Sequence, residues 1–324
     1  DPVGADGGRA VAAVDGRAAA RAATLGASLV VVYTAMISSA DAITKLIAGG
    51  YAAPQLYCLS GLIVMGLSVL ADRHPSQRRG LTTQSRGAMA IRSGATVLAA
   101  VSFFYAFRLL PFAEVFLFIG LMPILAGVMS GIILREHVRP VVWVALATGF
   151  GGVLCLFPNG FGAVSAGHIW AFSAALFGTL SMVMARYIGK RETNSLAQVF
   201  YPNMAIFVTM AVALPFVWQP MPLADLVWVA GYAVCLFTAR WLLVVALRLL
   251  PAYAVTPLMN LQFVWMVGLG ALFFGEFPAA NTYLGVAIVM GTGLFLVWDQ
   301  FTPEEQRKPL LAGFPFGRGF RTDP

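Results

Sequence analysis

The sequence has few charged residues for its length. Only 11% of its 324 residues are Asp, Glu, Lys or Arg, whereas about 25% is usual in a soluble globular protein. Hydrophobic residues make up 59% of the chain, and the mean hydropathy is +0.81. A soluble core could not bury that much apolar surface, so the composition indicates an integral membrane protein.

The sequence also has little of what catalytic and metal sites require. Its three cysteines, Cys58, Cys155 and Cys235, lie in apolar runs, and an odd number in such places argues against a disulfide framework. The three histidines have no metal-ligand spacing, and no Gly-rich loop ends in the Gly-Lys-Ser/Thr of a phosphate-binding loop. We therefore expect no cofactor, no metal and no catalytic residues, and an energy source other than ATP hydrolysis.

Long apolar runs are what the chain has in abundance. A helix needs roughly 20 apolar residues to cross a hydrocarbon layer of about 30 Å. Ten segments qualify, which predicts an all-α integral membrane protein with ten transmembrane helices. The predicted spans are 23–48, 53–71, 88–109, 111–134, 138–157, 166–188, 195–218, 223–247, 251–274 and 279–299.

The Lys and Arg residues are distributed unevenly over the loops between these spans. With the N-terminus placed in the cytoplasm, 18 of the 21 fall in cytoplasmic loops or tails, and only Arg108 falls outside. Lys45 and Arg240 lie within spans. This bias predicts that both termini are cytoplasmic, in what we take to be a bacterial inner membrane. It also explains the net charge of +7 without a nucleic-acid partner.

A unit of five spans occurs twice. Arg-Leu-Leu-Pro begins at Arg108 and again at Arg248, and Glu136 and Glu276 keep the same offset of 140 residues. Because five is odd, the second copy must be inverted in the membrane, which is typical of alternating-access transporters. The predicted organisation is a cytoplasmic tail (1–22), a first repeat (23–157), an external linker (158–165), a second repeat (166–299) and a second cytoplasmic tail (300–324). The alternative, that residues 23–42 form a cleaved signal peptide, would remove one helix and break the repeat.

The motifs that accompany the repeat resemble those of a known family. RLLP precedes the fourth and the ninth span, LREHVRP and FGEFPAA close them, and a Gly-rich segment follows each. In these features residues 25–299 resemble the EamA branch of the drug/metabolite transporter superfamily. The resemblance implies two inverted five-helix repeats and transport of a small organic solute, such as an amino acid, a vitamin or a similar metabolite.

Four ionisable residues in or beside the spans are candidates for substrate binding or coupling, because such groups are costly in lipid. Asp41 and Lys45 share one face of the first helix, so they form either a local ion pair or part of a substrate site. Glu114, in the first turn of the fourth helix, either interacts with the helix dipole or lines an outer vestibule with Asp41. Arg240 lies deep in the eighth helix, where we expect it to face the cavity and to pair with Asp41, with Glu114 or with an anionic substrate group; the alternative is that its long side chain extends to the inner membrane surface.

Uncharged polar and aromatic residues complete the predicted site. They are Tyr105, Tyr201, Asn203, Trp241 and Asn260. The Tyr and Asn side chains either hydrogen-bond between helices or face the substrate, and the Trp side chain either stacks on a substrate ring or meets lipid. The glycines of the fifth and tenth spans allow close packing within the chain or in a homodimer.

The function that these features predict is secondary active transport of a small organic solute by alternating access. The energy source would be proton coupling or exchange, and the partners would be a small-molecule organic substrate and membrane lipid. A membrane-embedded enzyme or a channel is the alternative. An enzyme would need a catalytic constellation and a channel would need repeated polar rings, and the sequence displays neither pattern.

Overall fold

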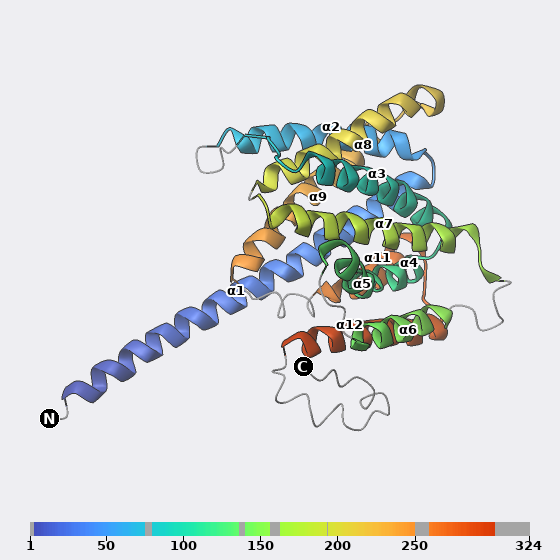
Figure 1. Cartoon of the computed structure of the whole chain (residues 1–324). Helices are drawn as coiled ribbons and strands as arrows, with labels where there is room; N and C mark the ends of the chain where they lie inside the picture. Colours follow the sequence, from blue (N-terminus) through green and yellow to red (C-terminus); the bar gives the residue numbers. More distant parts are fainter. Residues whose placement is uncertain are drawn as a thin grey trace, which may run out of the picture.

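The protein is all-helical in the part of the chain that the structure describes. The computed structural model describes residues 3–74, 80–135, 140–155, 163–192, 194–249 and 259–301, with side chains except at 3–23, 142, 195, 241, 244–249 and 296–301. These ranges contain no strand, as the predicted α class requires. The helices are α1 (Val3–Ala48), α2 (Ala53–Asp72), α3 (Arg86–Leu109), α4 (Phe112–Ile119), α5 (Met122–Leu134), α6 (Pro140–Leu154), α7 (Ala166–Gly189), α8 (Ser195–Val217), α9 (Leu223–Leu249), α11 (Leu261–Phe274) and α12 (Ala280–Phe301), as Figure 1 shows.

Several of these helices are suited to crossing a membrane. Within the described ranges, seven stretches are long and apolar enough: Thr24–Ala48, Ala53–Asp72, Arg86–Leu109, Phe112–Leu134, Ala166–Gly189, Leu196–Val217 and Leu223–Arg240. Three shorter apolar helices, Trp143–Leu154, Leu261–Phe274 and Ala280–Phe295, coincide with three further predicted spans. The integral membrane class is thereby supported, whereas the count of ten spans and the limits of the two repeats stay predictions.

Helix α1 begins earlier than the sequence predicts. The predicted span starts at residue 23, but the helix starts at Val3, and its apolar part is Thr24–Ala48. Residues 9–22 are rich in Ala and Arg, which are good helix formers. The stretch as a whole is too polar to count as a membrane span. The N-terminal end of α1 therefore projects from the helix bundle (Figure 1).

The fourth predicted span is broken. It forms two helices, α4 and α5, separated at Gly120 and Leu121. Pro123 lies in the first turn of α5. Because proline has no N–H and its ring clashes with the carbonyl group four residues earlier, a continuous helix could not pass through this point without strain.

The helices pack in pairs that join distant parts of the chain. Helix α1 packs on α9, α2 on α8, α3 on α7, and α6 on α12. Figure 1 shows α6 and α12 side by side at one edge of the bundle. Each pair joins one helix before residue 160 with one after it, so the two halves of the sequence interleave in space.

Two helix ends share an unusual backbone conformation. The residue that caps the end of α5 is Arg135, with φ 54° and ψ 34°, and the residue that caps α11 is Gly275, with φ 65° and ψ 24°. Arg135 is the one non-glycine residue with positive φ among the described residues. Gly275 follows Arg135 by the same 140 residues as the sequence repeat. Left-handed helix ends are common, but glycine adopts them at far lower cost than arginine.

Helices α6 and α12 approach each other through glycine. A Cβ atom at Gly152 would lie 2.9 Å from the carbonyl oxygen of Gly285, and a Cβ at Gly285 would lie 2.6 Å from that of Gly152. No other residue fits this contact without moving a backbone. These glycines therefore serve packing within the chain. A Cβ at Gly151, Gly291 or Gly293 would meet no atom of the described structure, so a homodimer through these helices stays a prediction.

Candidate functional site

Asp41 lies where α1 packs against α11. The amide nitrogen Nε2 of Gln262 donates a hydrogen bond of 3.2 Å to Oδ2 of Asp41. The Ser38 hydroxyl, one turn earlier on α1, donates a longer bond of 3.4 Å to the Gln262 carbonyl oxygen. The Asp41 side chain is partly buried. A carboxylate in this environment needs such donors, because an unpaired charge within a membrane is costly.

Three tyrosines interact with this carboxylate over a distance. Tyr33, Tyr57 and Tyr232 all interact electrostatically with Asp41. Tyr57 also contacts Tyr232 edge to face, with ring centroids 6.2 Å apart. The three residues come from α1, α2 and α9, which pack together. The result is an aromatic region with polar hydroxyl groups inside the helix bundle.

Arg240, on α9, interacts with two of these tyrosines, Tyr33 and Tyr232. Tyr33 precedes Asp41 by eight residues on α1, and Tyr232 precedes Arg240 by eight residues on α9, which is about 12 Å of helix rise in each case. Arg240 acts electrostatically on both tyrosines. These interactions link Asp41 and Tyr33 on α1, Tyr57 on α2, and Tyr232 and Arg240 on α9, and we call these five residues the polar column.

The predicted ion pair of Arg240 with Asp41 or Glu114 is not formed among the described side chains. Each carboxylate has another partner: Gln262 bonds to Asp41, and His168 pairs with Glu114. Trp241, predicted to stand beside this site, has its side chain outside the described residues.

A second arginine lies near Arg240. Arg92, in α3, donates from Nη1 to the Ser181 carbonyl oxygen at 3.3 Å and from Nη2 to the Gln198 carbonyl oxygen at 3.1 Å. These contacts link α3 to α7 and α8. Arg92 also interacts with Arg240. The sequence analysis counted Arg92 with the cytoplasmic loop before the third span, although the predicted span (88–109) already contains it.

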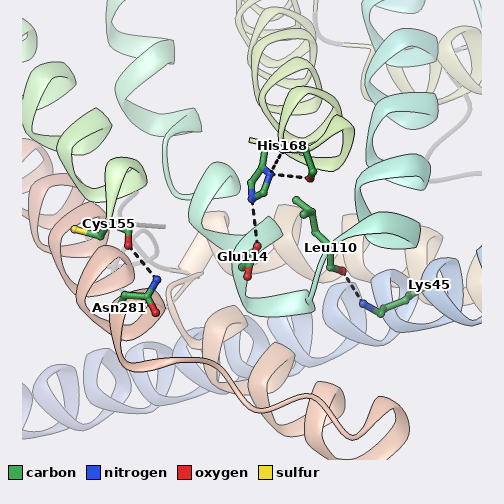
Figure 2. A network of polar contacts seen from close by, with 7 residues as sticks. Lys45, Leu110, Glu114, Cys155, His168 and Asn281 are labelled. Carbon is green, nitrogen blue, oxygen red and sulfur yellow. Dashed lines mark hydrogen bonds and ion pairs between the residues drawn. The ribbon is translucent and has the colours of Figure 1, made fainter. Parts of the chain in front are cut away.

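Lys45 joins three parts of the chain at the end of α1. Its Nζ lies 2.6 Å from Oε1 of Glu276 and donates to the Leu110 carbonyl oxygen at 2.7 Å. The ammonium group also lies 5.7 Å and 5.4 Å from the ring centroids of Phe112 and Phe274, within the range of cation–π attraction. Figure 2 shows the lysine reaching toward the turn between α3 and α4.

This contact corrects a prediction. The local ion pair of Asp41 and Lys45 does not form, because Lys45 extends toward Glu276 while Asp41 binds Gln262. A long lysine side chain at a helix end can leave its own helix in this way.

The backbone around Gly275 positions Glu276 to pair with Lys45. After the left-handed residue Gly275, the N–H of Glu276 donates to the Gly270 carbonyl oxygen at 3.0 Å, so this end of the helix occupies a carbonyl group of its last turns. The chain then turns back, and Oε2 of Glu276 accepts a hydrogen bond of 2.9 Å from the N–H of Phe112. The FGEFPAA motif is therefore a helix end that aims a carboxylate at Lys45 and at the start of α4.

Glu114 lies at the same end of the bundle as Lys45 and Glu276. Its Oε2 lies 3.4 Å from Nε2 of His168, in the first turn of α7 (Figure 2). Glu114 and Glu276 both line a cavity of about 120 Å³ between α4, α11 and the start of α12. The predicted vestibule shared by Glu114 and Asp41 is not this cavity, because Asp41 is absent from its lining.

The remaining predicted site residues are dispersed. Tyr105 contacts Trp170, with ring centroids 5.1 Å apart, near the Lys45 end of the bundle. The Tyr201 hydroxyl donates to the Leu81 carbonyl oxygen at 2.8 Å, and Asn203 donates to its own helix at Val199. Asn260 is the N-cap residue of α11. The structure therefore brings none of these four into hydrogen bonding with Asp41 or Arg240.

Sequence reasoning missed several residues of the polar column, of the Lys45 cluster (Lys45, Glu276 and the backbone at Leu110) and of their surroundings. They are Tyr33, Tyr57, Arg92, His168, Tyr232 and Gln262, together with Glu276 as a partner of Lys45. The available signal was the repeat, which singled out Glu276 as a helix end but not as a counter-ion.

A loop outside the spans has its own carboxylate. Glu192, after α7, accepts hydrogen bonds from the Thr83 hydroxyl at 2.8 Å and from the backbone N–H groups of Ser85 and Gln84 at 2.9 Å and 3.2 Å. Slight burial opposes ionisation, but these hydrogen bonds outweigh it and hold the pKa of Glu192 below its usual range. The contact ties the start of α3 to the end of α7.

Two proteins similar in sequence to this chain are named as transporters. A riboflavin transporter of Rhizobium johnstonii (strain DSM 114642 / LMG 32736 / 3841) is 29% identical over 269 residues, which cover 78% of this chain and 80% of that protein. A riboflavin transporter of Vibrio cholerae serotype O1 (strain ATCC 39315 / El Tor Inaba N16961) is 28% identical over 193 residues, covering 59% and 63%. Together with the apolar helices, these relatives define the class as an integral membrane transporter of a small metabolite.

One part of the chain matches a known family. Residues 21–157 match the model of the EamA-like transporter family. The predicted family resemblance is therefore confirmed. A solved crystal structure of a protein 18% identical in sequence covers 87% of this chain and 99% of its own, with a TM-score of 0.56, and shares its fold.

Proposed function

We propose that the protein is a secondary active transporter in which two inverted five-helix repeats give a small organic metabolite access to each side of the membrane in turn. The observation that carries the proposal is the polar column, in which Asp41, the tyrosines and Arg240 lie inside a bundle of apolar helices. Ionisable groups persist within a membrane where they serve a solute or ion path.

The pairing of the helices supports the inverted repeats. In the proposal the first repeat (23–157) holds α1 to α6, with α4 and α5 as one broken span, and the second repeat (166–299) holds α7 to α12. Exchanging the repeats converts the α1–α9 pair into the α7–α3 pair, and leaves α2–α8 and α6–α12 unchanged. A two-fold relation between repeats requires this pattern. The left-handed helix ends at Arg135 and Gly275 support the same relation.

The Lys45 cluster supports a state that is closed at one end. Lys45, Glu276 and the turn at Leu110 connect α1, α11 and α4 across the end of the bundle that the charge distribution places outside. In alternating access this seal must break when the site opens outward, so the ion pair is a candidate outer gate. The tail regions 1–22 and 300–324 would then be cytoplasmic, and residues 158–165 external.

Riboflavin is the first substrate to test, because both similar transporters carry that name. A planar ring system with several hydrogen-bonding groups suits an interior with three tyrosines, a carboxylate and an amide. Other vitamins, amino acids and similar metabolites are the next class. Asp41 is the proposed coupling group for protons, since it is the carboxylate within the column; exchange of solutes is the alternative source of energy.

Uptake into liposomes that contain the purified protein tests this function. Uptake of riboflavin, and then of a panel of vitamins and amino acids, is expected to saturate with concentration for at least one solute. Flux that rises without saturation would instead indicate a channel. Chemical conversion of the solute would indicate a membrane-embedded enzyme.

A further inference from the structure

A groove of about 590 Å³ lies at the start of α3, whereas the Lys45 cluster contacts the other end of that helix at Leu110. The groove is formed by the first turns of α3, the end of α5, the second half of α7 and the residues that follow α7. Helix α7 packs against both α3 and α5 (Figure 1). None of the five residues of the polar column lines the groove, so it is separate from the proposed solute site.

The rim of the groove is positively charged. Arg86, which begins α3, and Arg191, which follows α7, are exposed and line the groove. A direct contact holds them near each other, because Glu192 accepts hydrogen bonds from the N–H groups of Ser85 at 2.9 Å and Gln84 at 3.2 Å. The lining contains no Asp or Glu. Among the described residues, none forms an ion pair or a hydrogen bond with either guanidinium group.

The groups at this rim are arranged to bind an anion. The guanidinium carbon of Arg191 lies 4.1 Å from the ring centroid of Tyr187, and such stacking leaves the N–H groups in the guanidinium plane available to an oxyanion. Gly87 and Ala88, in the first turn of α3, also line the groove, and the N-cap residue Ser85 makes no capping hydrogen bond with its side chain. The N–H groups of a first turn have no acceptor within the helix and form the positive end of its dipole. Phosphate groups bind at such helix ends.

Away from the rim, the wall of the groove is apolar. It is lined by Ile91, Ile133, Leu180 and Met184. Leu180 precedes Gly189, the last residue of α7, by nine residues, which is about 14 Å of helix rise. The hydrocarbon part of one leaflet has about the same thickness, since the whole layer measures about 30 Å. A charged rim above an apolar wall of this depth matches a phospholipid, whereas a free phosphate ion would use the rim alone.

We propose that the groove binds an anionic phospholipid of the adjacent leaflet. Its phosphate group would lie at Arg86, Arg191 and the start of α3, and one acyl chain would follow the apolar wall. An anionic headgroup complements the two arginines, whereas a zwitterionic one would add a second positive charge beside them. A lipid bound to the folded protein alone stabilises it, here by joining α3, α5 and α7. The inference concerns a lipid partner and does not depend on which solute is transported.

Lipid titration of the purified full-length protein in detergent tests the proposal. The thermal unfolding midpoint is followed while dioleoylphosphatidylglycerol is added, or dioleoylphosphatidylcholine, which has the same acyl chains. One basic residue near a lipid surface contributes roughly a factor of 5 in affinity for an anionic lipid. The anionic lipid is therefore expected to act at a half-maximal concentration about 10- to 25-fold lower than the zwitterionic one. Arg86→Gln and Arg191→Gln should each raise that concentration about 5-fold, and Arg191→Lys, which keeps the charge, should raise it less.

Arg73→Gln is the matched control, because Arg73 is exposed at the same end of the bundle, after α2, but does not line the groove. This variant should respond to the anionic lipid as the parent protein does. The proposal is overturned if both lipids stabilise the protein equally. It is also overturned if Arg73→Gln weakens the response as much as Arg86→Gln and Arg191→Gln do, because general attraction to surface charge would then explain it.

Glycerol 3-phosphate and inorganic phosphate distinguish a lipid from a free phosphate group. Neither carries an acyl chain, so neither should stabilise the protein at the concentration at which the anionic lipid acts. Equal stabilisation by either compound would overturn the assignment to a lipid and would indicate a site for free phosphate.

Discussion

Asp41 is the residue on which coupling depends in this account. Its carboxylate is the one acid in the polar column, and Gln262 holds it on the α11 side. Replacing Asp41 by Asn keeps the shape and the hydrogen-bonding capacity but removes the titratable charge. We expect Asp41→Asn to abolish the pH dependence of transport, measured as uptake at several external pH values, while the elution profile of the folded protein is unchanged. A variant whose uptake still follows the pH gradient would exclude the proton role.

Lys45 and Glu276 are expected to depend on one another energetically. Lys45→Met leaves the half-buried Glu276 without its counter-ion, which should lower the free energy of unfolding by about 1–3 kcal/mol. Glu276→Gln should have a comparable effect. In the double variant the loss should be smaller than the sum of the two, since neither charge is left alone. Thermal unfolding of the four proteins measures this coupling, and strictly additive losses would show that the pair does not act as a unit.

At the scale of helices and loops, the end of α5 carries backbone strain. Arg135 adopts a left-handed conformation at φ 54°, which costs an L-residue roughly 1–2 kcal/mol relative to glycine. Arg135→Gly should therefore raise the free energy of unfolding by about 0.5–1 kcal/mol, because the greater freedom of glycine in the unfolded chain offsets part of the gain. Gly275→Ala is the reciprocal variant and should destabilise the protein. Thermal unfolding that moved in the opposite direction for either variant would contradict this geometry.

The loop contact of Glu192 predicts a pH effect on stability. Its pKa in the folded protein is lowered, so its stabilising effect is present above the pKa of the unfolded chain, about 4.3, and is lost as the pH falls through the folded value. Glu192→Gln should lower the unfolding midpoint at pH 7, and the difference from the parent protein should shrink in more acidic solution. The measurement is thermal unfolding of both proteins over a pH series, and a difference independent of pH would reject the role of the charge.

The elements were largely accessible from the sequence, because long apolar runs in lipid must be helical. The break at Gly120 was not recognised, although Pro123 marks it, since hydropathy alone is continuous there. The start of α1 was also misjudged, because its first turns are helical but polar. In both cases the length of the apolar run predicted the membrane span but not the residues at which the helix begins and ends.

The site could be predicted from the sequence less fully than the helices. Asp41 and Arg240 stood out as isolated charges in apolar segments, and both lie in the polar column. Their partners did not stand out, because Gln262, Tyr33 and Tyr232 are ordinary residues until tertiary packing brings them together. Lys45 was noticed, yet its counter-ion Glu276 comes from the other half of the chain, so no local pattern could have joined them.

For the whole molecule, the helix pairs and the two left-handed helix ends describe one arrangement. The halves of the chain interleave around a polar interior, and the Lys45 cluster connects them at one end. Such a bundle can open toward one side of the membrane and stay closed toward the other. This requires that its helices remain connected at the closed end. If the proposed alternating access holds, the seal at the Lys45 end is a requirement of the cycle rather than a feature of stability alone.

Counterflow in liposomes tests that claim most directly. Liposomes are loaded with an unlabelled solute that saturates uptake, and entry of the same labelled solute is followed without any ion gradient. A carrier with alternating access is predicted to take up the label transiently above its equilibrium level, because the excess unlabelled solute inside occupies the inward-facing site and slows exit of the label. A monotonic approach to equilibrium, unaffected by internal solute, would contradict the account.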